Sequence, residues 1–355
     1  MKKYIIILIA LIPLFFMSCN PDGIGIFYKI SVEPHLSSSA LSEKSVYKIV
    51  ELSGTKYVLA GGTVYKENGS DWDALKAPSG EIQAVSLAST STTIYSVYAD
   101  NSNSTMYQLS GTSWAQAAGT SGIADSNDLT LITIDGLNTA LFVNIETSTV
   151  GVYNISSYDG GTLTDITGGN SISMPVVSAA YDGTTDYYIV SSNTTNATSA
   201  VIYTTNALST NITVTTPTNG IDEGIGAIIY YSSNLYTSAK DGKLYKSIEN
   251  PSSLNWGAVN ASALSNKRLG NMEIIDIGGT NYLLIASNGG FYEMNLSGGT
   301  PVSPTIATIG STVYESVNLY TELVYSIFSS SAANTFYIGS SNGLWYSDTN
   351  ELTIK

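Results

Sequence analysis

Few residue types in this sequence could carry catalysis or hold a metal ion. Its 355 residues include one cysteine, Cys19, one histidine, His35, and one arginine, Arg268. A single Cys excludes a disulfide within the chain and any metal site built on cysteine pairs. A serine-hydrolase triad would have to recruit His35 as its base, and no metal or nucleotide motif is present. We therefore expect no metal ion, no cofactor and no nucleophilic catalytic centre.

Carboxylates are the remaining candidates, because glycoside hydrolysis needs two of them at a fixed separation across the sugar. The acidic residues that we considered are Asp128, Asp135, Asp222, Glu223, Glu273 and Asp276. Their spacing marks no pair, so each is expected to be a turn or strand-edge residue. Sialidases clamp a substrate carboxylate with several arginines, which lysines do not replace, so a chain with only Arg268 is not a sialidase.

The N-terminus has the composition of an export signal. Met1-Lys2-Lys3 is basic, and the apolar run from Tyr4 to Phe16 is shorter than the about 20 residues that span a bilayer. The leader ends in Phe16-Met17-Ser18-Cys19. This end resembles the bacterial lipobox in its looser, spirochaete-like form: Ser18 fits the small position, whereas Phe16 and Met17 depart from the commonest residues. The resemblance implies a signal peptide over residues 1–18 and lipid chains such as palmitate on Cys19, which would anchor the protein to a bacterial membrane.

Residues 19–44 are expected to contain the lipidated cysteine, a tether and a strand. Ile26 to Val32 alternates as a strand does, and we expect it to pair with the last repeat and close a ring. The formal net charge is −14, and basic residues do not cluster. We therefore expect no nucleic-acid partner.

The rest of the chain repeats one hairpin motif: a small polar turn with Gly, an apolar residue, a Tyr and a polar residue. Its fullest copy is Ser340 to Ser347, and the marker tyrosines of its copies are Tyr65, Tyr107, Tyr153, Tyr203, Tyr245, Tyr292 and Tyr346. Successive markers lie 42 to 54 residues apart. Short strands at such a period are typical of propeller blades. Residues 45–355 are therefore predicted to form an all-β domain, a β-propeller with seven four-stranded blades, or six if the widely spaced last copies merge.

An aromatic residue also recurs once per repeat on the expected second strand, at Tyr57, Tyr95, Phe142, Tyr187, Tyr236, Tyr282 and Phe336. We interpret these residues as packing between neighbouring sheets rather than as a platform for sugars. With its lipobox and hairpins, the chain resembles the loosely defined class of bacterial propeller-type lipoproteins. That resemblance implies a fold and an anchor, but no specific activity.

Two functions remain open at this point. The first is a non-catalytic binding or scaffolding propeller in the cell envelope, facing the periplasm or the cell surface, with a protein or glycan partner. The alternative is a carbohydrate-active enzyme, a glycosidase or lyase, that uses acidic residues at the propeller channel.

Overall fold

The structure is a computed structural model, and its compact unit runs from Ser38 to Lys355. It describes residues 40–79, 83–100, 103–121, 123, 129–170, 172–192, 200–215, 221, 224–247, 256–259, 262–302, 319, 322–331, 335–348 and 351–354. The leader, Phe16, Met17, Ser18, Cys19, His35 and the strand predicted over 26–32 lie outside the described residues. Within these ranges, no helix is both long and apolar enough to cross a membrane.

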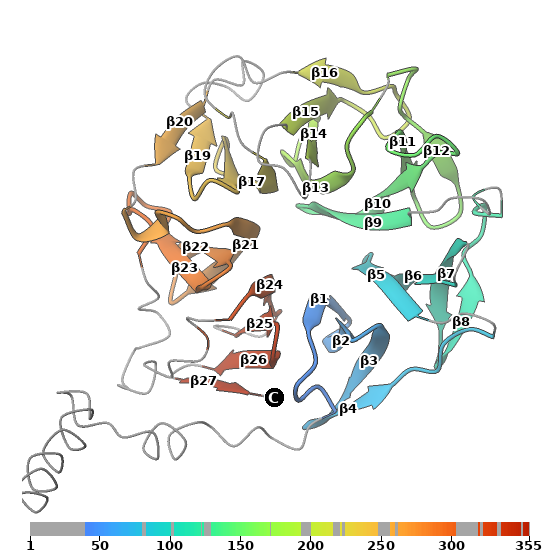
Figure 1. Ribbon diagram of the computed structural model, residues 1–355, viewed down its shortest axis with the longest axis horizontal. Helices are drawn as coiled ribbons and strands as arrows, with labels where there is room; N and C mark the ends of the chain where they lie inside the picture. Colours follow the sequence, from blue (N-terminus) through green and yellow to red (C-terminus); the bar gives the residue numbers. More distant parts are fainter. Residues whose placement is uncertain are drawn as a thin grey trace, which may run out of the picture. The chain divides into compact units, whose positions relative to one another are not determined.

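Strands that follow one another in sequence pair antiparallel (Figure 1). The first sheet contains β1 (Val46–Leu52), β2 (Thr55–Ala60), β3 (Thr63–Asn68) and β4 (Asp71–Ala74), and the second contains β5 (Gln83–Ser89), β6 (Ile94–Ala99), β7 (Ser104–Ser110) and β8 (Ser113–Gln116). An eight-stranded sheet contains β9 (Leu129–Asp135), β10 (Leu137–Glu146), β11 (Tyr153–Tyr158), β12 (Leu163–Asp165), β13 (Val176–Tyr181), β14 (Tyr187–Ser192), β15 (Ala200–Thr205) and β16 (Thr213–Thr215). The next contains β17 (Ile225–Tyr231), β18 (Asn234–Ala239), β19 (Leu244–Ser247) and β20 (Trp256–Val259). The last two contain β21 (Leu269–Ile277), β22 (Thr280–Ser287) and β23 (Gly290–Asn295), and then β24 (Val324–Ser329), β25 (Phe336–Ser340), β26 (Gly343–Asp348) and β27 (Glu351–Ile354).

The all-β prediction is confirmed, and most sheets have the expected four strands. The eight-stranded sheet was not expected. It consists of two antiparallel four-stranded parts, joined where β9 and β13 pair in parallel at Ile134–Ala179 and Asp135–Ala180. The three-stranded sheet has an isolated bridge between Glu293 and Val302 in place of a fourth strand.

The repeated hairpin has a physical reason that is visible in its last copy. Gly343 has a φ of 134°, which L side chains rarely adopt, so a glycine is needed at this turn. The Ser340 hydroxyl accepts a hydrogen bond from the N–H of Asn342 at 3.2 Å and donates one to the Gly343 carbonyl at 3.2 Å. The indole N–H of Trp345 also donates to this hydroxyl. The polar residues of the motif therefore hold the turn, and its apolar residues enter the core.

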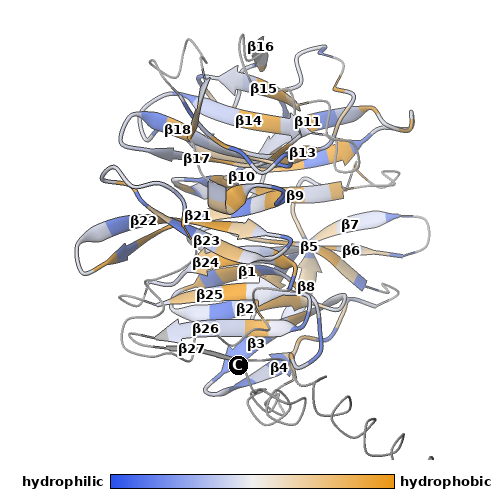
Figure 2. Ribbon diagram, turned by 60° about the vertical axis from the view of Figure 1, so that its left-hand side comes forward, coloured by the Kyte–Doolittle hydropathy of each residue, from blue (hydrophilic) through white to orange (hydrophobic). Residues whose placement is uncertain are grey.

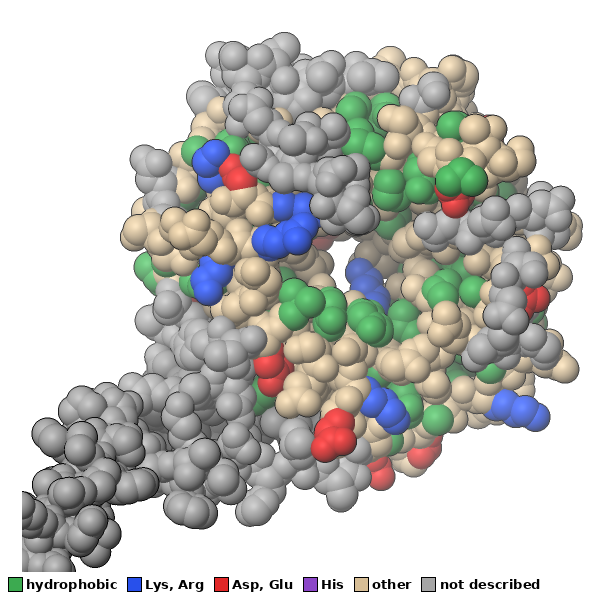
Figure 3. Space-filling model, in the orientation of Figure 1, with side chains coloured by type: hydrophobic (Ala, Val, Ile, Leu, Met, Phe, Trp, Pro, Cys, Tyr) green, Lys and Arg blue, Asp and Glu red, His purple; other side chains and the backbone are tan. Residues whose placement is uncertain are grey.

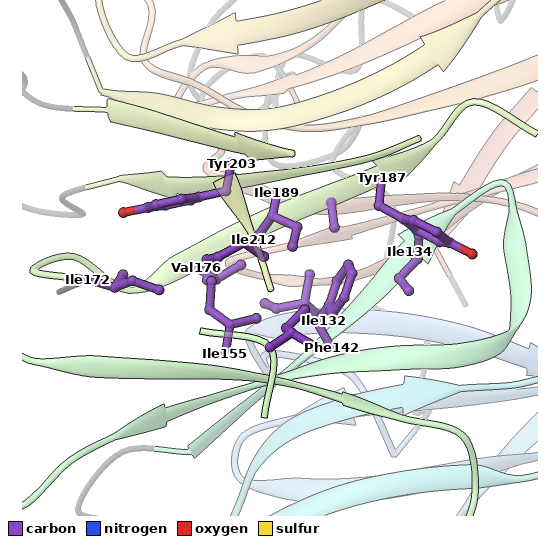
Figure 4. Packing of buried hydrophobic residues seen from close by; sticks show 12 residues of the cluster. Ile132, Ile134, Phe142, Ile155, Ile172, Val176, Tyr187, Ile189, Tyr203 and Ile212 are labelled. Carbon is purple, nitrogen blue, oxygen red and sulfur yellow. The ribbon is translucent and has the colours of Figure 1, made fainter. Parts of the chain in front are cut away.

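All marker tyrosines lie on the third strand of their repeat: β3, β7, β11, β15, β19, β23 and β26. The second-strand aromatics lie on β2, β6, β10, β14, β18, β22 and β25, and most are buried. The rings of Phe142 and Tyr187 meet edge to face across neighbouring repeats, with centroids 6.3 Å apart. Figure 4 shows them in a cluster where side chains from β9 to β11 face side chains from β13 to β15. Packing between repeats thus buries this cluster. Figure 2 shows hydrophobic residues interspersed with hydrophilic ones along the strands, and hydrophilic residues at the outer end of the hairpin of β22 and β23.

The first strands of successive repeats contact one another in a closed circuit. It runs from β1 through β5, β9, β13, β17, β21 and β24 and back to β1 (Figure 1). The first and last sheets share a cluster in which Leu41, Val46 and Val58 pack against Tyr337 and Leu344. Each sheet therefore has a packed neighbour on both sides, although the described residues do not include the strand that was expected to close the ring.

Charged residues also join the first and last sheets. Lys56, which is almost fully buried, lies 3.2 Å from Glu67, 4.0 Å from Glu51 and 5.3 Å above the ring of Tyr337. Glu51 in turn accepts a hydrogen bond from the hydroxyl of Ser330 at 2.9 Å. Each of these charges therefore has a partner of opposite sign or a polar donor, and removal of one partner would leave another buried charge uncompensated at this junction.

Candidate functional site

The first strands of the repeats surround a central cavity of about 1080 Å³. Side chains from β1, β5, β9, β13, β17, β21 and β24 line it. Its volume is at the upper end of the range for small-molecule sites. Figure 3 shows the opening on one face of the molecule, with hydrophobic side chains along one edge and Lys or Arg side chains along another.

Nearly every lining strand is irregular close to its start. The pairing with the second strand shifts between Val46 and Lys48 in β1, and at matching places in β5, β13, β17, β21 and β24. The residues left without a partner are Tyr47, Val85, Val177, Gly226, Gly270, Asn271 and Tyr325. A bulge bends its strand and re-aims the extra side chain. The bulges therefore decide which residues face the end of the channel.

A polar residue in the bulge or directly after it ties one repeat to the next. The hydroxyl of Ser86 on β5 accepts a hydrogen bond from the N–H of Leu131 on β9 at 3.0 Å, and Ser178 on β13 accepts one from Ile228 on β17 at 3.1 Å. Asn271 on β21 likewise accepts from the N–H of Ile327 on β24, at 2.7 Å. These bonds join corresponding parts of successive strands, so the bulges lie at the same end of the channel.

We call this end the bulge-side mouth and define it by Tyr47, Val85, Leu323, Tyr325, Lys240 and Arg268. Among the described residues, five large hydrophobic side chains are exposed, and three of them belong to this mouth: Tyr47 at 46%, Val85 at 42% and Leu323 at 40%. The rings of Tyr47 and Tyr325 touch, with centroids 4.8 Å apart. Exposed apolar side chains gathered in one place mark binding surfaces more often than scattered ones do.

The opposite side of the mouth is cationic. Lys240 follows β18, and its N–H donates to the carbonyl of Gly224 just before β17, while Arg268 immediately precedes β21. Burial lowers the pKa of Lys240, and the positive charge of Arg268 lowers it further. In the described part of the chain, the Arg268 guanidinium forms no ion pair, and its backbone alone bonds to Asn288. Two neighbouring cations beside an opening favour the binding of an anion.

Three further charged residues lie inside the channel, on different strands: Lys48 on β1, Asp135 on β9 and Glu273 on β21. Burial raises the pKa of Glu273 to about 8, and the negative charge of Asp135 raises it further, against a hydrogen bond from the backbone of Ser329 and the charge of Lys48. Burial also raises the pKa of Asp135 to about 6, although backbone hydrogen bonds oppose this shift.

Lys48 is the cation of this interior group. Burial lowers the pKa of its ammonium group, while the charge of Glu273 raises it. The ammonium lies 3.5 Å from the hydroxyl of Thr133. Asp135 is the last residue of β9. Glu273 accepts a hydrogen bond from the backbone of Ser329, the last residue of β24, so both carboxyls lie toward the end of the channel opposite the bulges.

The structure brings together two of the six acidic residues considered from the sequence, Asp135 and Glu273. Asp276 is exposed and accepts a hydrogen bond from the N–H of Gly279 in a turn, as expected for a structural role. Asp128, Asp222 and Glu223 lie outside the described residues. Sequence reasoning did not single out Lys48, and of the mouth residues it singled out only Arg268. It missed Tyr47, Val85 and Tyr325, because a bulge depends on the register with a partner strand and leaves no mark in one strand alone.

No protein-family model matches the chain, and no curated protein matches it in sequence. Solved structures, however, are similar to it in their fold. The extracellular domain of BT4673 from B. thetaiotaomicron is similar with a TM-score of 0.60 and 13% identity, over 88% of this chain and 39% of that one. This chain has a β-propeller-like fold. The predicted propeller repeats are thereby confirmed in their general form.

Two other similar structures support the same fold. PorZ, a bacterial surface component of the type-IX secretion system of Porphyromonas gingivalis, has a TM-score of 0.57 and 13% identity, over 89% of this chain and 38% of PorZ. YCF48 bound to D1 peptide has a TM-score of 0.59 and 13% identity, over 91% of this chain and 99% of YCF48. The chain thus spans about two fifths of the length of BT4673 and PorZ. At such low identity, the likeness carries the fold alone.

Proposed function

We propose that this protein is a membrane-anchored lipoprotein of the cell envelope whose propeller, with seven blades, binds a partner without catalysing a reaction. The bulge-side mouth is the observation that carries the proposal. It combines exposed apolar side chains with two cations at the opening of a large cavity. Such a combination suits recognition of a partner, because apolar contacts supply affinity and charges supply orientation.

The similar structures are compatible with a binding role outside the cytoplasm. One is described as an extracellular domain, one as a surface component of a secretion system, and one was solved with a peptide bound. Propeller folds host many functions, so these descriptions support the proposal only as examples of what the fold can do. The anchor rests on the lipobox resemblance of Phe16-Met17-Ser18-Cys19.

The anchor has a direct test. In the Cys19→Ala variant, most of the protein should leave the membrane fraction, because the acyl chains that hold it there cannot be attached. Fractionation after a carbonate wash measures this. A Ser38→Ala variant, which keeps Cys19, is the matched control and should stay with the membrane. A Cys19→Ala protein that remains in the washed membranes would contradict the lipid anchor.

A second candidate function is favoured by one specific observation. Asp135 and Glu273 line the same channel and have raised pKa values of about 6 and about 8, as the acid of a glycosidase pair requires. The protein would then be a glycosidase or lyase with these two carboxyls in the catalytic roles.

A screen with oligosaccharides distinguishes the candidates. If the protein is such an enzyme, Asp135→Asn and Glu273→Gln should each reduce turnover by about 100-fold or more, since each removes one proton-transfer group. Asp276→Asn, on the same strand β21 but in an exposed turn, should keep full turnover. Turnover that survives both channel substitutions, or no turnover by the unmodified protein, would exclude the enzymatic alternative.

A further inference from the structure

We infer that the bulge-side mouth recognises an acidic peptide segment, one that carries a carboxylate close to a bulky aromatic or aliphatic side chain. This inference rests on the proposed binding function and names the chemistry of its partner. It follows from the asymmetry of the mouth, whose two sides carry different kinds of residue.

The apolar side consists of bulge residues and a neighbour. Tyr47 and Tyr325 occupy the bulges of β1 and β24, Val85 occupies that of β5, and Leu323 precedes β24. These strands are adjacent in the circuit, so the four side chains form one continuous apolar border. Its aliphatic members suit apolar side chains better than the hydroxyl-covered faces of a sugar. The tyrosines tilt against each other by 50° and do not offer a flat platform.

The cationic side lies over β17 and β21, where the bulges contain Gly226 and Gly270 instead of large residues. Gly226 is also needed for packing, because an added Cβ would lie 2.6 Å from the carbonyl oxygen of Leu269. A Cβ added on Gly226 would also lie 2.8 Å from the Cα of Gly270, whose carbonyl accepts a hydrogen bond from the Ser238 hydroxyl at 2.6 Å. A Cβ added on Gly270 itself would meet no atom within 4 Å, so the channel has room for a ligand on that side of Gly270, two residues after Arg268.

Charge complementarity identifies the group that would sit there. Arg268 is the single arginine of a chain with a net charge of −14, and its exposed guanidinium has no ion pair within the described residues. Guanidinium binds a carboxylate through two parallel hydrogen bonds, and an anion would also relieve the repulsion between Arg268 and Lys240.

A peptide-display selection against the full-length protein in detergent tests this inference. Random peptides should be enriched for sequences in which an acidic residue, or a free carboxyl terminus, is adjacent to an aromatic or large aliphatic residue. Synthetic versions then separate the two sources of the carboxylate: one version has its acidic side chain replaced by the amide, and the other has an amidated terminus. Fluorescence anisotropy measures the affinity of each.

Variants then locate the site. We expect Arg268→Glu to weaken a selected peptide by about tenfold or more, and Tyr47→Ser by a similar factor, because both residues are exposed and central to the mouth. Lys76→Glu, a charge reversal at an exposed lysine after the outer strand β4, should change affinity less than twofold.

Three outcomes would overturn the inference. One is a selection without acidic–apolar enrichment, and another is stronger binding of an acidic oligosaccharide such as polygalacturonate than of any peptide. The third, binding that is unchanged in both mouth variants, would reject this site while leaving the binding function intact. The proposed anchor and envelope location are tested independently by the Cys19→Ala fractionation.

Discussion

Replacing Gly339 by valine should lower the free energy of unfolding by about 3 kcal/mol or more. Gly339 lies on β25 in the last sheet, where it faces β1 of the first sheet. A Cβ at this position would lie 2.5 Å from the carbonyl oxygen of Val46 and 2.7 Å from the Ser326 hydroxyl. Because the nearest atom belongs to backbone, the strands would have to separate to make room. Separation would also disturb the Lys56 network at the same junction.

Urea denaturation of the full chain measures this effect. Gly161→Ala is the matched control, since an added Cβ there meets no atom within 4 Å, and it should change stability by less than about 1 kcal/mol. If Gly339→Val unfolds at the same urea concentration as the unmodified protein, the first and last sheets do not pack as described.

Stability should fall as the pH rises from about 5 to 8, and Glu273 should cause much of this fall. The pKa of Glu273 is raised from 4.5 to about 8, so the folded protein holds its proton more tightly than the unfolded chain. The contribution of this group is therefore fully present below pH 4.5 and is lost as the pH rises toward 8, by at most about 1.4 kcal/mol per pH unit. Asp135 adds a smaller effect of the same sign between its ordinary pKa of 3.8 and about 6.

The Glu273→Gln variant removes this titration and keeps an oxygen that can accept the hydrogen bond from Ser329. Relative to the unmodified protein, we expect this variant to be about as stable at pH 5 and more stable by about 2 kcal/mol at pH 8. This value is smaller than the full pKa shift of Glu273 would give, because the Glu273 side chain is partly exposed to solvent. Asp73→Asn, at an exposed position of β4, should follow the unmodified protein at every pH. Parallel curves for Glu273→Gln and the unmodified protein would show that this carboxyl is not buried in the channel.

Much of the fold could be predicted from the sequence, because its repeats are specified locally. The turn at Asn342 and Gly343 and the alternation of apolar residues set each hairpin within a few residues of chain. The local pattern did not predict that the boundary between the third and fourth repeats is bridged, where β9 pairs in parallel with β13. Neighbouring sheets decide such boundaries through contacts that are distant in sequence.

The candidate site was predictable only in part. The sequence drew attention to Asp135 and Glu273 as acids, and to Arg268 as the single arginine, but not to their places. Lys48, Asp135 and Glu273 come from strands of three different repeats, and they meet because the circuit of first strands closes. Likewise, Tyr47 and Val85 face the mouth because their strands bulge against a partner.

The sequence by itself thus determined the repeating all-β architecture, since turns and side-chain alternation act over short stretches of chain. Only the tertiary structure decided the chemistry of the channel and its mouth. A register shift of one residue re-aims a side chain, and burial or a neighbouring charge shifts the pKa of an acidic or basic group. Both effects depend on neighbours that lie far away in the sequence.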